Sequence, residues 1–112
     1  MSKEIVVDGV TYRPVVETST DWVMVRSAQA GVFAGRLETK NGDEVRLVGA
    51  RRIWYWDGAA TLSQLAIEGT SKPQNCKFPP AVPYITVLGV CEIIPMTQKA
   101  VESIQGVKEW RS

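Results

Sequence analysis

Arginines and aromatic residues are concentrated in one short stretch, RRIWYW, at residues 51–56. An arginine guanidinium binds phosphate oxygens in a bidentate arrangement, and an indole ring stacks on a nucleobase. Arg51, Arg52, Trp54 and Trp56 are therefore candidate contacts for a nucleotide. The alternative interpretation is that the tryptophans fill the core while the arginines extend along it to the surface.

Two further groups are candidates for the same site. Arg26 and Arg36 each end an apolar, strand-like segment near a turn and would add positive charge to its rim, unless they are ordinary edge charges. Asn75, Lys77 and Phe78 lie between prolines, and a rigid loop presents such groups with little loss of entropy on binding. Phe78 alternatively clamps this loop onto the core.

The composition argues against catalysis. The chain has no histidine, which excludes histidine-based triads, imidazole acid–base chemistry and most zinc sites. We find no phosphate-binding P-loop, no glycine-rich dinucleotide motif and no Cys/His metal spacing. We therefore expect no enzyme, no metal and no cofactor. The net charge of +1 provides no overall attraction to nucleic acid or to an anionic membrane.

Period-two alternation and turn dipeptides predict an antiparallel sheet. Asp8-Gly9 separates two β-branched runs and predicts a hairpin. Asn41-Gly42 predicts a second tight turn, and Gly49 predicts a bulge or a close backbone approach. The three strands expected after the hairpin are residues 22–27, 31–40 and 44–56, which would place Arg52, Trp54 and Trp56 on one face unless the bulge changes the phase.

The second half of the chain predicts two helices around one further strand. The first helix spans 61–68, with Thr61 and Gln64 as a capping box and Gly69 at its end. A proline-rich surface loop follows, and the apolar run 84–94 reads as one strand, buried on both faces or covered by another subunit. The last helix begins after Thr97, turns Ala100, Val101 and Ile104 inward, and ends at Gly106.

These elements predict one α+β domain over residues 1–112, built on a strongly bent antiparallel sheet or a small barrel with two short helices. We see no membrane span and no signal peptide, so we expect a cytoplasmic protein that contacts no membrane. Cys76 and Cys91 are then expected to stay reduced. The apolar run and the four tryptophans favour a homo-oligomer.

Three motifs within residues 21–110 resemble those of a known protein family: VMVRSAQAGVFAGRLE, the RRIWYW-G-A-LSQLA-EG core and the VKEW ending. They resemble a family of short proteins encoded in phage and prophage genomes, mostly of unknown function. This group is in turn similar to the first type of Thoeris anti-defence proteins, which sequester cyclic ADP-ribose signals and, in some members, cyclic oligonucleotides. The resemblance implies a non-enzymatic homo-oligomer with nucleotide pockets near subunit boundaries.

The leading hypothesis is thus a phage-encoded anti-defence protein that binds a small anionic nucleotide signal without cleaving it. An Sm-like small barrel that binds RNA is an alternative, suggested by the strand-turn-strand spacing of residues 31–53, although the near-neutral charge counts against it. A structural phage component with tryptophans buried in an assembly interface is another. An enzyme acting on the signal is the least supported.

Overall fold

The computed structural model describes residues 5–7, 10–12 and 20–112. Strands β1 (Ile5–Val7) and β2 (Val10–Tyr12) pair in antiparallel fashion, which confirms the two strands of the predicted first hairpin. The Asp8-Gly9 turn itself lies outside the described residues. None of the helices within the described ranges has both the length and the apolar character needed to cross a bilayer.

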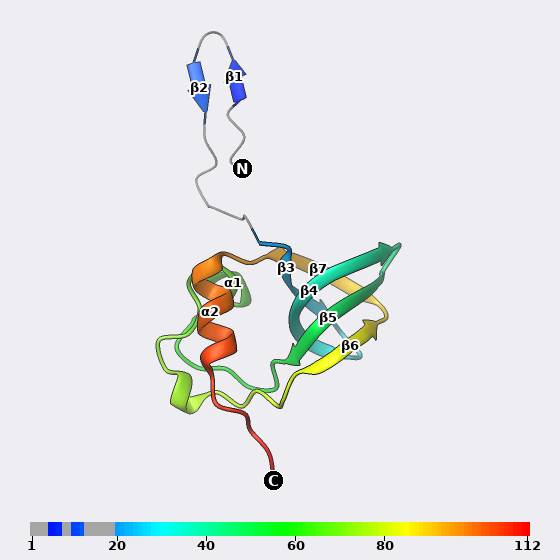
Figure 1. Ribbon diagram of the computed structural model, residues 1–112, viewed down its shortest axis with the longest axis vertical. Helices are drawn as coiled ribbons and strands as arrows, with labels where there is room; N and C mark the ends of the chain where they lie inside the picture. Colours follow the sequence, from blue (N-terminus) through cyan, green and yellow to red (C-terminus); the bar gives the residue numbers. More distant parts are fainter. Residues whose placement is uncertain (1–4, 8–9, 13–19) are drawn as a thin grey trace.

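A five-stranded antiparallel sheet forms the centre of the fold, with strand order β6-β5-β4-β3-β7 (Figure 1). The three consecutive strands predicted after the first hairpin pair as expected, and Gly42 has the positive φ of 64° that its tight turn requires. The strands are β3 (Trp22–Ser27), β4 (Gly31–Asn41), β5 (Glu44–Arg52), β6 (Val82–Val87) and β7 (Val90–Pro95).

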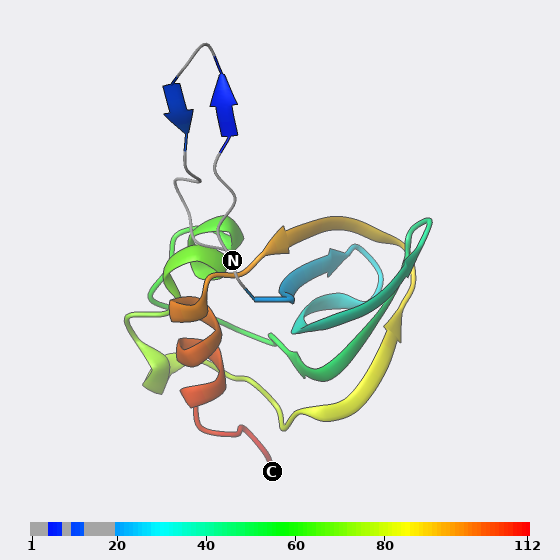
Figure 2. The ribbon, with the colours of Figure 1, turned by 45° about the horizontal axis from the view of Figure 1, so that its top comes forward.

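The apolar run 84–94 is not the single buried strand that its sequence suggests. It contributes to both β6 and β7, which are the two edges of the sheet and are joined only by Leu88 and Gly89. The sheet bends so strongly that the ends of its two edge strands meet there (Figure 2). The Ser27 hydroxyl donates to the Leu88 carbonyl at 2.8 Å and fixes this corner.

The bent, open sheet is the observed form, rather than the small barrel. In the described part of the chain β6 pairs only with β5 and β7 only with β3, so the two edges do not close on each other. Together with two short helices this confirms the α+β class and the strongly bent antiparallel sheet.

The predicted bulge lies at Gly49, whose φ is 61°. Arg36 pairs with Val48, but Ala34 pairs with Arg51, so β5 carries one extra residue at this point. β5 then ends at Arg52, four residues earlier than the predicted 44–56 strand. The chain leaves the sheet there, and Trp54 and Trp56 therefore do not share a strand face with Arg52.

Both helices form where their capping residues predict them. Helix α1 (Leu62–Glu68) begins after Thr61, whose hydroxyl accepts from the Gln64 backbone N–H, and ends at Gly69 with φ 77°. Helix α2 (Gln98–Gly106) begins after Thr97, whose hydroxyl accepts from the Ala100 N–H at 3.1 Å. A short 3₁₀ helix, η1 (Pro73–Asn75), lies in the proline-rich loop.

The core has two parts. One lies inside the curve of the sheet and consists of Val23, Val25, Phe33, Val45, Leu47, Ala50 and Val87. The other joins the sheet to the two helices and the proline-rich loop, and it includes the predicted inward residues of α2. Its members are Met24, Ala34, Ile53, Leu65, Ala66, Cys76, Phe78, Met96, Ala100, Val101, Ile104 and Val107. Both cysteines are free.

Candidate aromatic and cationic site

Three segments that are far apart in the sequence meet at the end of the molecule where the chain leaves α2. Tyr55 and Lys77 exchange backbone hydrogen bonds of 3.2 and 2.8 Å in an isolated antiparallel bridge. The C-terminal segment joins this bridge because the Trp110 N–H donates to the Phe78 carbonyl at 3.0 Å. Tyr55, residues 77–78 and Trp110 are therefore held side by side by backbone hydrogen bonds.

Four side chains from these segments form what we call the aromatic-cation surface: Trp54, Tyr55, Lys77 and Trp110. Trp54, Tyr55 and Trp110 are 64%, 51% and 45% exposed as residues. The two indoles are nearly parallel, with an interplanar angle of 9° and centroids 6.4 Å apart. The Lys77 ammonium lies 6.0 Å from the Tyr55 centroid and 5.7 Å from the Trp110 centroid, within cation–π range.

Phe78 and Arg51 support this surface from beneath. Phe78 is fully buried, as expected if it clamps the loop onto the core. Arg51 is only 6% exposed, and its guanidinium donates to the carbonyls of Phe78, Pro79 and Ile104 at 3.0, 3.0 and 2.7 Å. These bonds tie β5 to the loop and to the end of α2. Burial lowers the pKa of Arg51, an effect that the nearby Glu109 carboxylate opposes.

Asn75 acts within the loop that carries Lys77. Its amide donates to the Asp57 carboxylate at 2.9 Å, and the Gly58 N–H donates to the same carboxylate at 2.8 Å. The two bonds lower the pKa of Asp57, the Asn75 bond having the larger effect. Asn75 thus fastens the loop to the segment that follows Trp54.

The predicted residues on β3 and β4 lie away from this surface. Arg26 makes a 3.1 Å ion pair with Glu92 on the neighbouring strand β7. Arg36 lies 3.7 Å from the Asp21 carboxylate. All four of these side chains are substantially exposed, which is the edge-charge arrangement considered for the two arginines.

Arg52 and Trp56 also have structural contacts elsewhere. The Arg52 guanidinium donates to the Ala30 carbonyl at 2.7 Å and lies 4.4 Å from the centroid of the Phe33 ring. The Trp56 indole N–H donates to the Ala59 carbonyl at 3.2 Å. Of the nine predicted residues, only Trp54 and Lys77 belong to the aromatic-cation surface, and Arg51, Asn75 and Phe78 support it from within.

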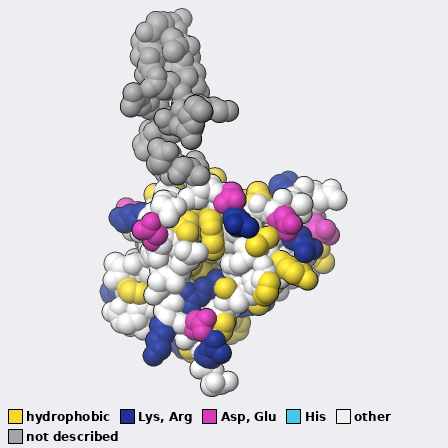
Figure 3. All heavy atoms as spheres, viewed as in Figure 1, with side chains coloured by type: hydrophobic (Ala, Val, Ile, Leu, Met, Phe, Trp, Pro, Cys, Tyr) yellow, Lys and Arg dark blue, Asp and Glu magenta, His cyan; other side chains and the backbone are white. Residues whose placement is uncertain are grey.

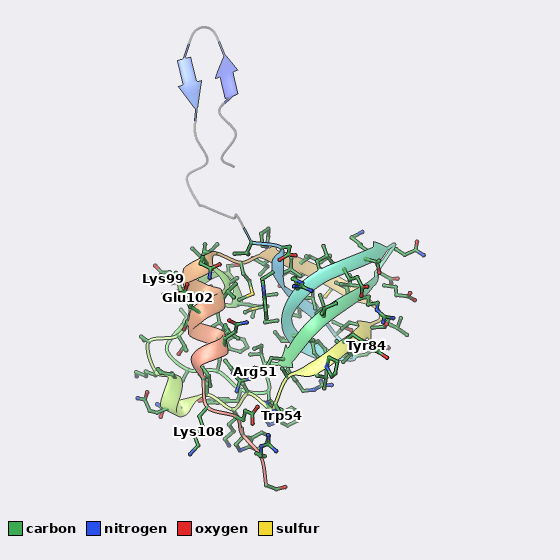
Figure 4. The ribbon with its side chains drawn as sticks, viewed as in Figure 1. Arg51, Trp54, Tyr84, Lys99, Glu102 and Lys108 are labelled. Atoms are coloured by element: carbon green, nitrogen blue, oxygen red, sulfur yellow. The ribbon has the colours of Figure 1, made fainter. Side chains whose placement is uncertain are left out.

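A pocket of about 440 Å³ adjoins the surface, and Lys108 is its exposed cationic wall. Figure 4 shows Trp54 and Lys108 at the same end of the molecule, on either side of the C-terminal segment, and basic side chains also gather there in Figure 3. Arg111 forms an ion pair with Glu109. The pocket is lined by Pro73, Gln74, Cys76, Gly106, Lys108, Glu109 and Trp110.

Sequence reasoning missed three members of this site: Tyr55, Lys108 and Trp110. Alternation along a 44–56 strand places Tyr55 on the face opposite Trp54, but β5 ends before either residue. Trp110 and Lys108 come from the C-terminal tail, and their only signal in the sequence was an amphipathic ending that carries the fourth tryptophan.

Over residues 20–112, together with the backbone of 5–7 and 10–12, no group of three acidic, cysteine or histidine side chains is placed to hold a metal ion. No curated protein and no solved structure matches the chain. A family model does match, over residues 20–104, a range that contains Trp54, Tyr55 and Lys77 and ends before Trp110. The chain belongs to this family, the domain of unknown function DUF6948.

Proposed function

We propose that the aromatic-cation surface and the adjoining pocket bind a nucleotide, with the base stacked on an exposed indole and the phosphate held by lysine ammonium groups. The observation that carries this proposal is the pair of exposed, nearly parallel indoles of Trp54 and Trp110, with the Lys77 ammonium 5.7 Å from the second ring.

The rings suit a flat, polarisable ligand. Every nucleobase has a π-face, and stacking on an aromatic side chain contributes about 1–3 kcal/mol per base. Tyr55 and Trp110 are held by backbone bonds to the 77–78 segment, and Trp54 directly precedes Tyr55, so little backbone freedom is lost when a ligand binds. Adjoining exposed aromatic rings on a small domain are typical of a binding surface.

The charges beside the rings suit phosphate. Lys77 and Lys108 make no ion pair with any carboxylate in the described part of the chain, whereas Arg111 is paired with Glu109. An ammonium group has three donors, so Lys77 can contact a ring and a phosphate oxygen together. The pocket volume of about 440 Å³ lies within the range of roughly 300–1,000 Å³ typical of small-ligand sites.

We further propose that the protein captures its ligand unchanged and that the ligand is a cyclic nucleotide signal. The absence of histidine from the sequence supports binding without turnover. The sequence resemblance described above supports the narrower proposals: a phage-encoded anti-defence protein, a homo-oligomer in the host cytoplasm, and cyclic ADP-ribose isomers or cyclic oligonucleotides as ligands.

Calorimetric titration with cyclic ADP-ribose isomers, cyclic di- and trinucleotides and AMP tests binding directly. Loss of one stacked ring is worth about 1–3 kcal/mol, which raises Kd by roughly 5- to 150-fold. We expect this increase for Trp54→Ala and for Trp110→Ala. Ligand recovered intact after denaturing the complex would distinguish capture from cleavage.

Tyr84→Ala is the matched control. Tyr84 is also an exposed ring, 60% accessible, with the Arg46 guanidinium 4.3 Å from its centroid, but it lies on β6 away from the site (Figure 4). This variant should keep the affinity of the wild type. No heat with any member of the panel would refute the proposal. Tighter binding to single-stranded RNA than to any nucleotide of the panel, with a steep salt dependence, would show that the ligand is RNA and would contradict the small-nucleotide proposal.

A further inference from the structure

A second, smaller pocket lies between α2 and the bulge of β5. Its volume is about 210 Å³, and Arg51 is one of its walls. Figure 4 places Arg51 between α2 and the sheet, and Figure 3 shows basic side chains within the hollow at that position. Gly49 lines the pocket, and a Cβ at this residue would meet no atom within 4 Å, so there is free space beside it.

The buried guanidinium gives this pocket an unusual chemistry. A guanidinium has five N–H donors, and the described contacts of Arg51 use three of them, all for neutral carbonyl groups. One N–H on each terminal nitrogen is left, a number that suits the two oxygens of one carboxylate. No described carboxylate lies within ion-pair distance of Arg51, so its buried charge attracts an anion.

The charge of Glu109 limits which anions can bind beside Arg51. It lines the same pocket and interacts with Arg51 over a distance longer than an ion pair. Its Oε1 is ion-paired with Arg111, which leaves Oε2 to attract a positive group on a ligand and to disfavour a second negative one. The remaining walls are mostly apolar and include Trp22, Ile104 and Val107.

We propose that this pocket binds a small zwitterion with an aliphatic body, that is, an α-amino acid such as leucine. Its carboxylate lies against Arg51, its ammonium group toward Glu109, and its side chain against Trp22 and Ile104. The volume of about 210 Å³ is below the roughly 300–1,000 Å³ of sites for drug-sized ligands, which agrees with a molecule smaller than a nucleotide. Glu109 also lines the pocket beside the aromatic-cation surface, but Arg51, Trp22 and Ile104 do not, so the carboxylate and the side chain of this ligand would bind apart from the proposed nucleotide site.

The test is a titration of the full-length, ¹⁵N-labelled protein with four probes, followed at the Arg51 Nε–H and the Trp22 indole N–H. The probes are L-leucine, 4-methylpentanoate without the amino group, 3-methylbutylamine without the carboxylate, and inorganic phosphate. We expect L-leucine to shift both signals in a saturable way, with at least tenfold weaker binding of each other probe. No shift with L-leucine, or tighter binding of phosphate, would overturn the proposal.

Two variants keep the test independent of folding, since neither removes a hydrogen bond of Arg51. Glu109→Gln should weaken L-leucine and strengthen 4-methylpentanoate, because it removes both the attraction and the repulsion. Ala81→Tyr should fill the pocket from an exposed lining position, whereas Ala28→Tyr, in the exposed β3–β4 turn, should not affect binding. Unchanged L-leucine affinity in both pocket variants would contradict the assignment, whatever happens at Trp54 and Trp110.

Discussion

Replacing Arg51 with methionine removes three hydrogen bonds between β5, the proline-rich loop and the end of α2, while leaving a side chain of similar length. The bonds to Phe78 and Ile104 are buried, so their carbonyl groups lose their guanidinium donor inside the protein. These two carbonyl groups each keep one backbone N–H donor, from Trp110 and Val107, so the loss is that of the hydrogen bonds from a charged donor, about 1.5–3 kcal/mol each. The apolar methionine recovers part of this loss through burial, at about 25 cal/mol per Å².

We therefore expect Arg51→Met to lower the free energy of unfolding by about 3 kcal/mol, which leaves the protein folded within the usual 5–15 kcal/mol. Urea denaturation measures this change. With an m value of about 1.5 kcal/mol/M, the midpoint should fall by about 2 M.

Two further variants serve as controls for the stability loss of Arg51→Met. Arg51→Lys should recover part of the loss, because an ammonium group still donates to some of the carbonyls. Arg52→Met removes one partly buried bond, to Ala30, and the cation–π contact with Phe33, and should cost about 1–2 kcal/mol. If Arg51→Met lowers the midpoint no more than Arg52→Met does, Arg51 is not the structural link between the three segments.

Two other predictions concern the segments around the site. Gly69→Ala should destabilise by at least about 2 kcal/mol, because φ is 77° and the new Cβ would lie 2.4 Å from the Ser103 Cβ. Gly42→Ala, with φ 64° and open space, should cost only about 1 kcal/mol, and equal midpoints in urea would contradict this reasoning. Asn75→Ala should raise the pKa of Asp57, measured by ¹³C NMR of its carboxyl carbon, because the larger stabilising hydrogen bond is lost. The depressed pKa stabilises the fold above the unfolded-state pKa, and this stability is lost as pH falls from there through the folded value. Because Asn75→Ala raises only the folded value, the loss should be smaller in this variant and complete at a higher pH. An unchanged Asp57 titration would show that the contact is not formed in solution.

Local signals in the sequence predicted the helices and the first strands well. The caps at Thr61, Thr97 and Gly69 depend on residues only a few positions away, so the sequence carries all the information needed. The turn at Asn41-Gly42 and the bulge at Gly49 were predictable for the same reason, since both require a positive φ.

Local sequence signals did not predict which strands form the two edges of the sheet. Leu88 and Gly89 interrupt an apolar run that otherwise has the composition of one strand, and only the pairing of β6 with β5 and of β7 with β3 shows that the chain changes edge there. Similarly, strand alternation extended β5 through Trp56, whereas the backbone of Tyr55 pairs with Lys77 instead.

The candidate site depends on contacts between distant segments. Trp54 and Lys77 are among the predicted candidate residues and lie on the aromatic-cation surface, but their neighbour Trp110 reaches them only because its N–H bonds to the Phe78 carbonyl. Nothing within the C-terminal tail indicates this contact. Conversely, the sequence suggests that Arg51 contacts a phosphate at the surface. Its burial depends on the packing of α2 against the loop, which local sequence patterns do not predict.

The central claim is that a nucleobase stacks on Trp54 and Trp110. The most direct measurement follows the four indole N–H signals of the ¹⁵N-labelled protein during titration with the tightest-binding nucleotide of the panel. We predict saturable shifts of the Trp54 and Trp110 signals with one common Kd, while the Trp22 and Trp56 signals stay in place. Shifts confined to Trp22 or Trp56, or no shift at Trp54 and Trp110 under saturating ligand, would contradict the account.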